Sequence, residues 1–329
     1  MSLVSTGFLV FLLVGVIVYY LIPKKAQWAW LLILSYAYYL CSGYKTVVFI
    51  LLTTIVTFTS GILLERTEDN LAKSLKAEGL AREDKKALKE KAKTYKKRVV
   101  VLALLLVFGV LAVVKYHNFA IENVNGIIKA FGGNGRISTF TLLLPLGISF
   151  YSFQSISYVI DVYRGKVKVQ KNLLKLATYV TLFPQLIAGP IVRYETVEKE
   201  LDERKETKED FAYGVTRFTT GLAKKVLIAN MLGELCKVFL NGTEKSVAFY
   251  WIYGITYTLQ IYFDFSAYSD MAIGLGRMFG FHFLENFNYP YISKSITEFW
   301  RRWHISLSSW FKDYVYIPLG GNRVGKAKH

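Results

Sequence analysis

The 329-residue sequence lacks paired cysteines, a metal-ligand cluster and a visible internal repeat. Its two cysteines, Cys41 and Cys236, lie in or beside apolar segments without motif spacing, which excludes a disulfide framework and a zinc motif. No group of histidines, cysteines and acids has the spacing of a metal site, so we expect no metal. The missing repeat argues against a transporter built from two related halves.

Charge is also absent from long stretches of the chain, although hydrophobic residues make up 53% of it. A helix that crosses a bilayer needs about 20 apolar residues, so several of these stretches predict transmembrane helices and the others predict short or re-entrant segments. They are continuous and not alternating, which favours helices over barrel strands. The sequence therefore predicts an all-α, polytopic integral membrane protein. The uncharged runs are Met1–Pro23, Ala26–Tyr44, Thr46–Leu64, Val99–Val114, Ile137–Ile160, Leu176–Val192 and Ser246–Phe263.

The formal net charge of +17 is concentrated in basic clusters between these runs. In a soluble protein it would suggest nucleic acid, but the positive-inside rule gives a simpler account. Lys24 and Lys25, the segment Glu65–Arg98 and the cluster Arg164–Lys171 fall on one side under alternating crossings. We therefore expect a cytoplasmic charged loop over residues 65–98, membrane lipids as partners of the basic loops, and no nucleic acid. A solvated or membrane-surface helix pair is the preferred interpretation of this loop, and binding of a cytoplasmic partner is the alternative.

The chain divides into two predicted parts. Residues 1–116 form N-terminal transmembrane helices with the charged loop, and residues 117–329 form a core with interrupted apolar runs. Pro145 breaks one run and Pro184 the next; such broken helices are tolerated at membrane depth only when buried or lining a wet cavity. Residues Phe211–Leu240 are amphipathic, which suits an interfacial or re-entrant helix.

Two motif candidates have simpler explanations. The glycines of Gly274–Gly280 resemble a dinucleotide loop, but Phe279 occupies the third glycine position, and close helix packing explains them better. Ser306, Ser308 and Ser309 lack a nucleophile elbow, so we expect helix-packing or hydrogen-bonding serines.

His304 is the candidate functional histidine. It follows Trp303 and the pair Arg301 and Arg302 in a stretch, predicted to be helical, whose tryptophans make one side bulky. An imidazole can titrate near neutral pH, as a general base must, and the two arginines suit an anionic donor such as a phosphate.

Acidic residues precede His304 in apolar surroundings. A carboxylate at the centre of a bilayer costs roughly 2.5–3.5 kcal/mol even on permissive scales. We therefore expect Asp264 and Asp270 to lie inside the helix bundle with a polar or cationic partner, and not against lipid.

Three longer motifs carry a resemblance to a known family: LFPQLIAGPIVRY from Leu182, FDFSAYSDMAIGLG from Phe263, and ENFNYPYISKSITEFWRRWHISLSSWFKDYVYIPLGGNR from Glu285. With them, the chain is similar to the bacterial branch of the membrane-bound O-acyltransferase family. The residues of these motifs resemble those of the members that O-acetylate alginate more than those of the members that D-alanylate teichoic acid.

The resemblance implies a multi-helix bundle with re-entrant helices around a central funnel through the membrane. It also implies that His304 is catalytic, together with a second histidine in a W-H-G context further along. The chain stops at His329 before such a segment, so we expect a C-terminally truncated sequence that is inactive by itself. The candidate funnel or donor-binding residues in the matched motifs are Arg193, Asp264, Tyr268, Asp270, Glu285, Asn286, Arg301, Arg302 and Asp313.

The function implied is that of a membrane O-acetyltransferase subunit in the cell inner (cytoplasmic) membrane. It would pass an acetyl group from a cytoplasmic donor toward an extracytoplasmic polysaccharide or peptidoglycan. We expect acetyl-CoA as the acyl donor, no bound cofactor, and an extracytoplasmic acetyltransferase as partner protein. D-alanyl transfer to teichoic acid on the same fold, and a non-enzymatic transporter or scaffold of a polysaccharide-export complex, stay open. The sequence does not identify the glycan or the oligomeric state.

Overall fold

A computed structural model describes residues 2–76, 81–186, 189–243 and 246–323. Within these ranges the chain contains helices and no strand, so the all-α prediction is confirmed there. The chain forms two compact units, one made of Met1–Tyr38 with Leu182–His329 and the other of Tyr39–Thr181. The boundary predicted between residues 116 and 117 stays a prediction.

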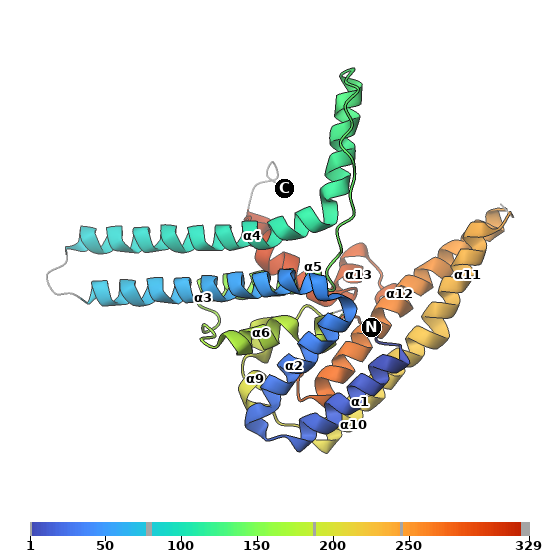
Figure 1. The fold of residues 1–329 in the computed structure, drawn as a ribbon, viewed down its shortest axis with the longest axis horizontal. Coiled ribbons are helices and arrows are strands. Elements are labelled where there is room, and N and C mark those ends of the chain that lie inside the picture. The colour runs from blue at the N-terminus through green and yellow to red at the C-terminus, as the bar shows by residue number, and fades with distance from the viewer. Residues whose placement is uncertain (1, 77–80, 187–188, 244–245, 324–329) are drawn as a thin grey trace. The chain divides into compact units, whose positions relative to one another are not determined.

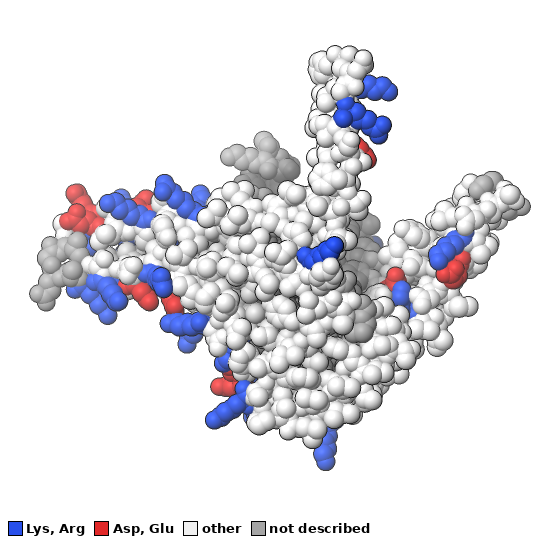
Figure 2. All heavy atoms as spheres, in the orientation of Figure 1, with Lys and Arg blue, Asp and Glu red and all other residues white. Residues whose placement is uncertain are grey.

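The unit Tyr39–Thr181 is built on a long helical hairpin (Figure 1). Helix α3 (Val47–Leu75) lies beside α4 (Arg82–Ala130). The helical stretches Tyr44–Leu75, which includes η1 (Tyr44–Thr46), and Arg82–Ala130 are long and apolar enough to cross a membrane. The predicted loop over residues 65–98 is the polar end of this hairpin and is helical in its described part. Figure 2 shows its Lys, Arg, Asp and Glu side chains gathered at this end.

Beyond α4 the same unit continues through a non-helical return segment. Asn125 exchanges two hydrogen bonds of 2.8 Å with the backbone of Ile137, which holds the segment against α4. Helix α5 (Ile148–Tyr163) begins only after Gly147, whose φ of 65° is left-handed. The predicted interruption of the apolar run at Pro145 is therefore confirmed. Helix α6 (Leu173–Thr181) completes the unit.

The other unit places the predicted site. It starts with α1 (Thr6–Leu21) and the first part of α2 (Lys24–Gly43). The predicted amphipathic helix over residues 211–240 is present, but a π-helical turn divides it. The remaining elements in order are α7 (Phe183–Leu186), α8 (Tyr194–Val197), α9 (Glu200–Glu203), α10 (Lys208–Ala223), the π-helical η2 (Lys224–Ala229), α11 (Asn230–Asn241), α12 (Val247–Met278), η3 (Pro290–Ile292), α13 (Ile296–Arg302), α14 (Ile305–Phe311), the π-helical η4 (Lys312–Tyr316) and η5 (Gly321–Arg323).

Helices α10 and α12 touch through their backbones. A Cβ built on Gly274 would lie 2.5 Å from the backbone nitrogen of Phe218, and one on Gly214 would lie 2.7 Å from the carbonyl oxygen of Gly274. About two helical turns further along α10, a Cβ on Gly221 would lie 2.7 Å from the carbonyl oxygen of Ala267. Only glycine permits this approach, so the prediction of close helix packing at Gly274 is confirmed.

Candidate functional site

His304 lies at a break between two short helices. The predicted continuous helix is wrong here, because α13 ends at Arg302 and α14 begins at Ile305. His304 has φ 44° and ψ 56°, in the left-handed region that residues with a side chain rarely adopt. Such a conformation costs on the order of 1–3 kcal/mol and persists only where the surrounding structure imposes it.

Two backbone hydrogen bonds impose the break. The N–H of Asn288 donates to the carbonyl of Arg302, and the N–H of Ile305 donates to the carbonyl of Asn286, both over 2.9 Å. The segment before η3 is thus tied to the chain on either side of His304. This tie replaces helical hydrogen bonds that the break removes, and it holds His304 in the strained conformation.

The His304 ring is enclosed by aromatic side chains. Its exposed fraction is 9%, and the Phe265 ring meets it edge-on with 4.7 Å between centroids. The Phe287 ring lies nearly parallel to it at 6.5 Å. Burial lowers the pKa of His304 to about 4, so the imidazole is neutral at pH 7. A neutral imidazole keeps one nitrogen free to accept a proton.

Asn286 is the polar centre beside this ring. Its side chain is fully buried, and its Oδ1 lies 3.1 Å from His304 Nδ1. The same oxygen accepts from the backbone N–H of Ser306 over 3.1 Å and from the Ser306 hydroxyl over 2.9 Å. The Ser306 hydroxyl accepts in turn from the N–H of Ile191 over 3.0 Å. These bonds join the first and third motifs of the sequence, and they confirm Ser306 as a hydrogen-bonding serine.

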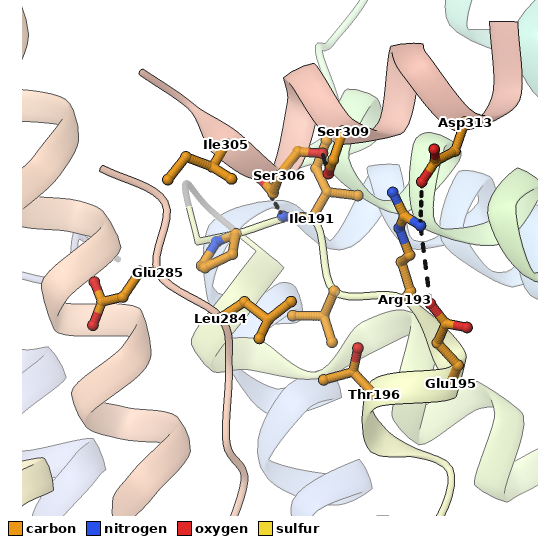
Figure 3. Close-up of a pocket in the computed structure, with 12 residues that line it drawn as sticks. Ile191, Arg193, Glu195, Thr196, Leu284, Glu285, Ile305, Ser306, Ser309 and Asp313 are labelled. Carbon is orange, nitrogen blue, oxygen red and sulfur yellow. Dashed lines mark hydrogen bonds and ion pairs between the residues drawn. The ribbon is translucent and has the colours of Figure 1, made fainter. Parts of the chain in front are cut away.

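Ser306 also lines a cavity of about 290 Å³ (Figure 3). Arg193 Nη1 lies 2.7 Å from an Asp313 oxygen and 3.9 Å from a Glu195 oxygen. His304 is not among the residues that line this cavity. Arg193 thus faces two carboxylates, whereas the third lining carboxylate, Glu285, lies apart from it and pairs with Arg217 (Figure 3). Its lining residues are Pro190, Ile191, Val192, Arg193, Glu195, Thr196, Leu284, Glu285, Ile305, Ser306, Ser309 and Asp313.

The acidic residues of α12 pair with cations of α10 and η2. Asp270 accepts from Arg217 Nε over 2.9 Å and from Lys224 Nζ over 2.6 Å, while Arg217 Nη2 also lies 2.6 Å from Glu285. Lys225 Nζ lies 2.5 Å from an Asp264 oxygen. Cationic partners for both aspartates are thus confirmed.

The three cations themselves were not predicted as site residues. The sequence contains one signal for them: Arg217, Lys224 and Lys225 are spaced among the apolar residues of an amphipathic helix. These cations face α12 only because that helix packs against α12. That packing depends on glycine contacts between segments about 50 residues apart.

The structure brings some predicted residues together and separates others. Arg193, Glu285 and Asp313 share the cavity, whereas Tyr268 and Asp264 line a separate hollow. Arg302 bonds Glu298 over 2.9 Å and the carbonyl of Asn288, so its guanidinium is engaged within the fold. Arg301 is exposed. In the described ranges, no group of three or more His, Cys, Asp or Glu side chains could hold a metal ion.

Comparison with known proteins defines the class. Residues 167–329 match the model of MBOAT, the membrane-bound O-acyltransferase family, and the chain belongs to that family. It is 52% identical over 229 residues to the "Probable alginate O-acetylase AlgI" of Pseudomonas aeruginosa, covering 69% of this chain and 43% of the relative. It is 36% identical over 258 residues to the peptidoglycan O-acetyltransferase of Helicobacter pylori, covering 70% and 48%.

A third relative is the teichoic acid D-alanyltransferase of Bacillus subtilis, 33% identical over 181 residues, covering 54% of this chain and 46% of that protein. The chain thus spans less than half the length of these curated relatives. The predicted family resemblance is confirmed, and a membrane protein follows from it.

Proposed function

We propose that this protein is an O-acetyltransferase subunit that uses His304 to move an acetyl group from a cytoplasmic donor toward an extracytoplasmic polysaccharide or peptidoglycan. The observation that carries the proposal is the buried, neutral imidazole at a strained helix break. Acetyl-CoA is the proposed donor and a separate extracytoplasmic acetyltransferase the proposed partner. The proposed setting is the inner membrane, crossed several times by helices that enclose a funnel, with some re-entrant.

The chemistry is acyl transfer between a thioester and a hydroxyl. The hydroxyl oxygen attacks the acyl carbonyl, a neutral imidazole nitrogen accepts the hydroxyl proton, and the thiol leaves with a proton. Phe265 and Phe287 keep the imidazole in an apolar enclosure. Exclusion of water protects the donor from hydrolysis during this step.

The charges that line the cavity indicate which kind of substrate group it would bind. Two carboxylates, Glu195 and Asp313, face one arginine and oppose the phosphate groups of an acyl-CoA, so we assign the cavity to a hydroxyl-bearing or cationic group instead. Arg193, held by Asp313, acts there as a structural cation and not as a free anion receptor. This assignment replaces the donor-binding role that the sequence suggested for Arg193.

D-alanyl transfer to teichoic acid is the second candidate. The acidic wall of the cavity favours it in one respect, because the ammonium group of a D-alanyl ester is a cation that carboxylates attract. The greater identity to the acetylating relatives favours acetyl transfer.

The test replaces His304 in the natural gene and measures the acetyl content of the surface polysaccharide, together with the amount of protein in the membrane. We expect His304→Ala to reduce acetylation by about 10²- to 10⁴-fold with protein retained, as loss of a general base does. His304→Asn keeps hydrogen bonding but cannot act as a base near neutral pH. His117→Ala, at a half-buried histidine of α4 outside the site, is the matched control.

Three outcomes decide between the readings. Loss of acetylation in both His304 variants supports proton transfer. Near-normal acetylation in the Asn variant alone indicates an orienting role. Normal acetylation in both variants removes His304 from the site and favours a scaffold or transporter. Teichoic acid D-alanine content, measured in parallel, separates the two acyl groups.

A further inference from the structure

We propose that Asn286 is a positioning residue: its amide oxygen holds His304 in the tautomer with the proton on Nδ1, which leaves Nε2 as the nitrogen that accepts a proton. This inference rests on the proposed function, because it concerns the same histidine. It gives Asn286 a role toward His304 in place of the predicted contact with a ligand.

The orientation of the Asn286 amide follows from its neighbours. The backbone N–H of Ser306 can only donate, so the Asn286 atom 3.1 Å away must be the oxygen. The Ser306 hydroxyl accepts from the N–H of Ile191, which leaves its own proton for Asn286 Oδ1 at 2.9 Å. Two donors other than the imidazole therefore fix this oxygen in place.

The tautomer of His304 follows from that orientation. Its Nδ1 lies 3.1 Å from Asn286 Oδ1, which is an acceptor, so Nδ1 carries the ring proton. The Ser306 oxygen, 3.5 Å from the same nitrogen, has its proton directed to Asn286 and does not compete. Nε2 is then left with a lone pair.

An asparagine suits this role better than an aspartate. A carboxylate at this buried position would favour the charged imidazolium, which has no lone pair to accept a proton. The neutral amide fixes the ring without adding charge. Asn286 Nδ2 is buried and has no acceptor among the described residues, which costs about 1–3 kcal/mol. Retaining that cost indicates a positioning role for the oxygen and not a gain in stability.

The first test is nitrogen NMR of ¹⁵N-histidine-labelled full-length protein in membranes, with His304→Asn used to assign the His304 signals. We expect His304 Nδ1 in the range of a protonated ring nitrogen and Nε2 in the range of an unprotonated one. The reverse assignment would overturn the proposal. This readout does not depend on activity, so it stands even where His304 proves dispensable for acetylation.

The second test is the pH profile of acetyl transfer in Asn286 variants. Asn286→Asp keeps an acceptor and adds a charge, so we expect the acid limb to move up by at least about one pH unit. Asn286→Ala should lose about 10²-fold or more in kcat, and Asn70→Ala, at an exposed asparagine of α3 outside the site, should behave as wild type. An unshifted acid limb in Asn286→Asp, with His304→Ala inactive, would refute the positioning role and leave the proposed function intact.

Discussion

Gly274→Ala tests the backbone contact that brings α10 onto α12. The added Cβ would lie 2.5 Å from the Phe218 nitrogen and 2.6 Å from the Gly214 carbonyl oxygen, whereas ordinary contacts begin at 3.4 Å. The neighbours are backbone atoms, so no side chain can rotate away. The helices must separate by about 0.9 Å at this point, the difference between 2.5 and 3.4 Å.

The expected cost combines packing and charge. Overpacking costs typically about 1–3 kcal/mol, and a rigid backbone neighbour places this site at the upper end. The same separation lengthens the bond from Arg217 to Asp270, now 2.9 Å, and weakens a part-buried ion pair by about 1 kcal/mol. The free energy of unfolding should therefore fall by about 3–4 kcal/mol.

Gly254→Ala on the same helix is the control. No neighbouring atom lies within 4 Å of its Cβ position, so alanine should raise the free energy of unfolding by about 0.5–1 kcal/mol through helix propensity alone. Thermal unfolding of both variants in one detergent should then give midpoints that differ on the order of 10 °C. Equal midpoints would show that α10 and α12 are not in backbone contact.

Three further predictions concern the charges and the topology. Asp270→Asn should cost about 2 kcal/mol in thermal unfolding and Asp264→Asn less, because the Asp264 side chain is 31% exposed and that of Asp270 only 8%. Burial lowers the pKa of His304 to about 4, so the free energy of unfolding should fall by about 3 kcal/mol as the pH drops from 6.5 toward 4; His304→Asn should flatten this pH dependence of the unfolding midpoint. Residues 86 and 134 lie beyond opposite ends of the apolar stretch of α4. When Lys86→Cys and Asn134→Cys are each made in an otherwise cysteine-free protein, an impermeant reagent outside cells should label Asn134→Cys only. Labelling of Lys86→Cys from outside would contradict the topology.

The sequence predicts those parts of the fold that depend on local pattern. Continuous uncharged runs predicted helices, although residues 137–145 of one run are not helical. Pro145 predicted an interruption, and leucines among the Lys, Glu and Ala of residues 65–98 predicted a polar helix pair. Each of these signals lies within the segment that it describes. They therefore required no knowledge of which segments meet in the fold.

The site is less predictable because its key features depend on long-range contacts. The break at His304 contradicts a strongly helical local pattern, and it is held by backbone bonds from residues 286 and 288. The hydrogen bonds of Asn286 depend on Ile191 and Ser306, which lie in different motifs. The motifs identified the residues, but only the fold shows how they contact one another.

The π-helical turn η2 sets the rotational phase between α10 and α11. It holds consecutive lysines, Lys224 and Lys225, against two aspartates of α12 that lie six residues apart. A π turn contains about one residue more than an α turn. Deleting one residue from Leu227–Ala229 would restore regular α-helix and rotate α11 by about 100° relative to α10, since an α-helix has 3.6 residues per turn. The number of residues between Arg217 of α10 and the start of α11 is therefore fixed in this chain. Homologous sequences that keep the ion pairs of Arg217, Lys224 and Lys225 should tolerate substitutions in this turn far better than a change of its length.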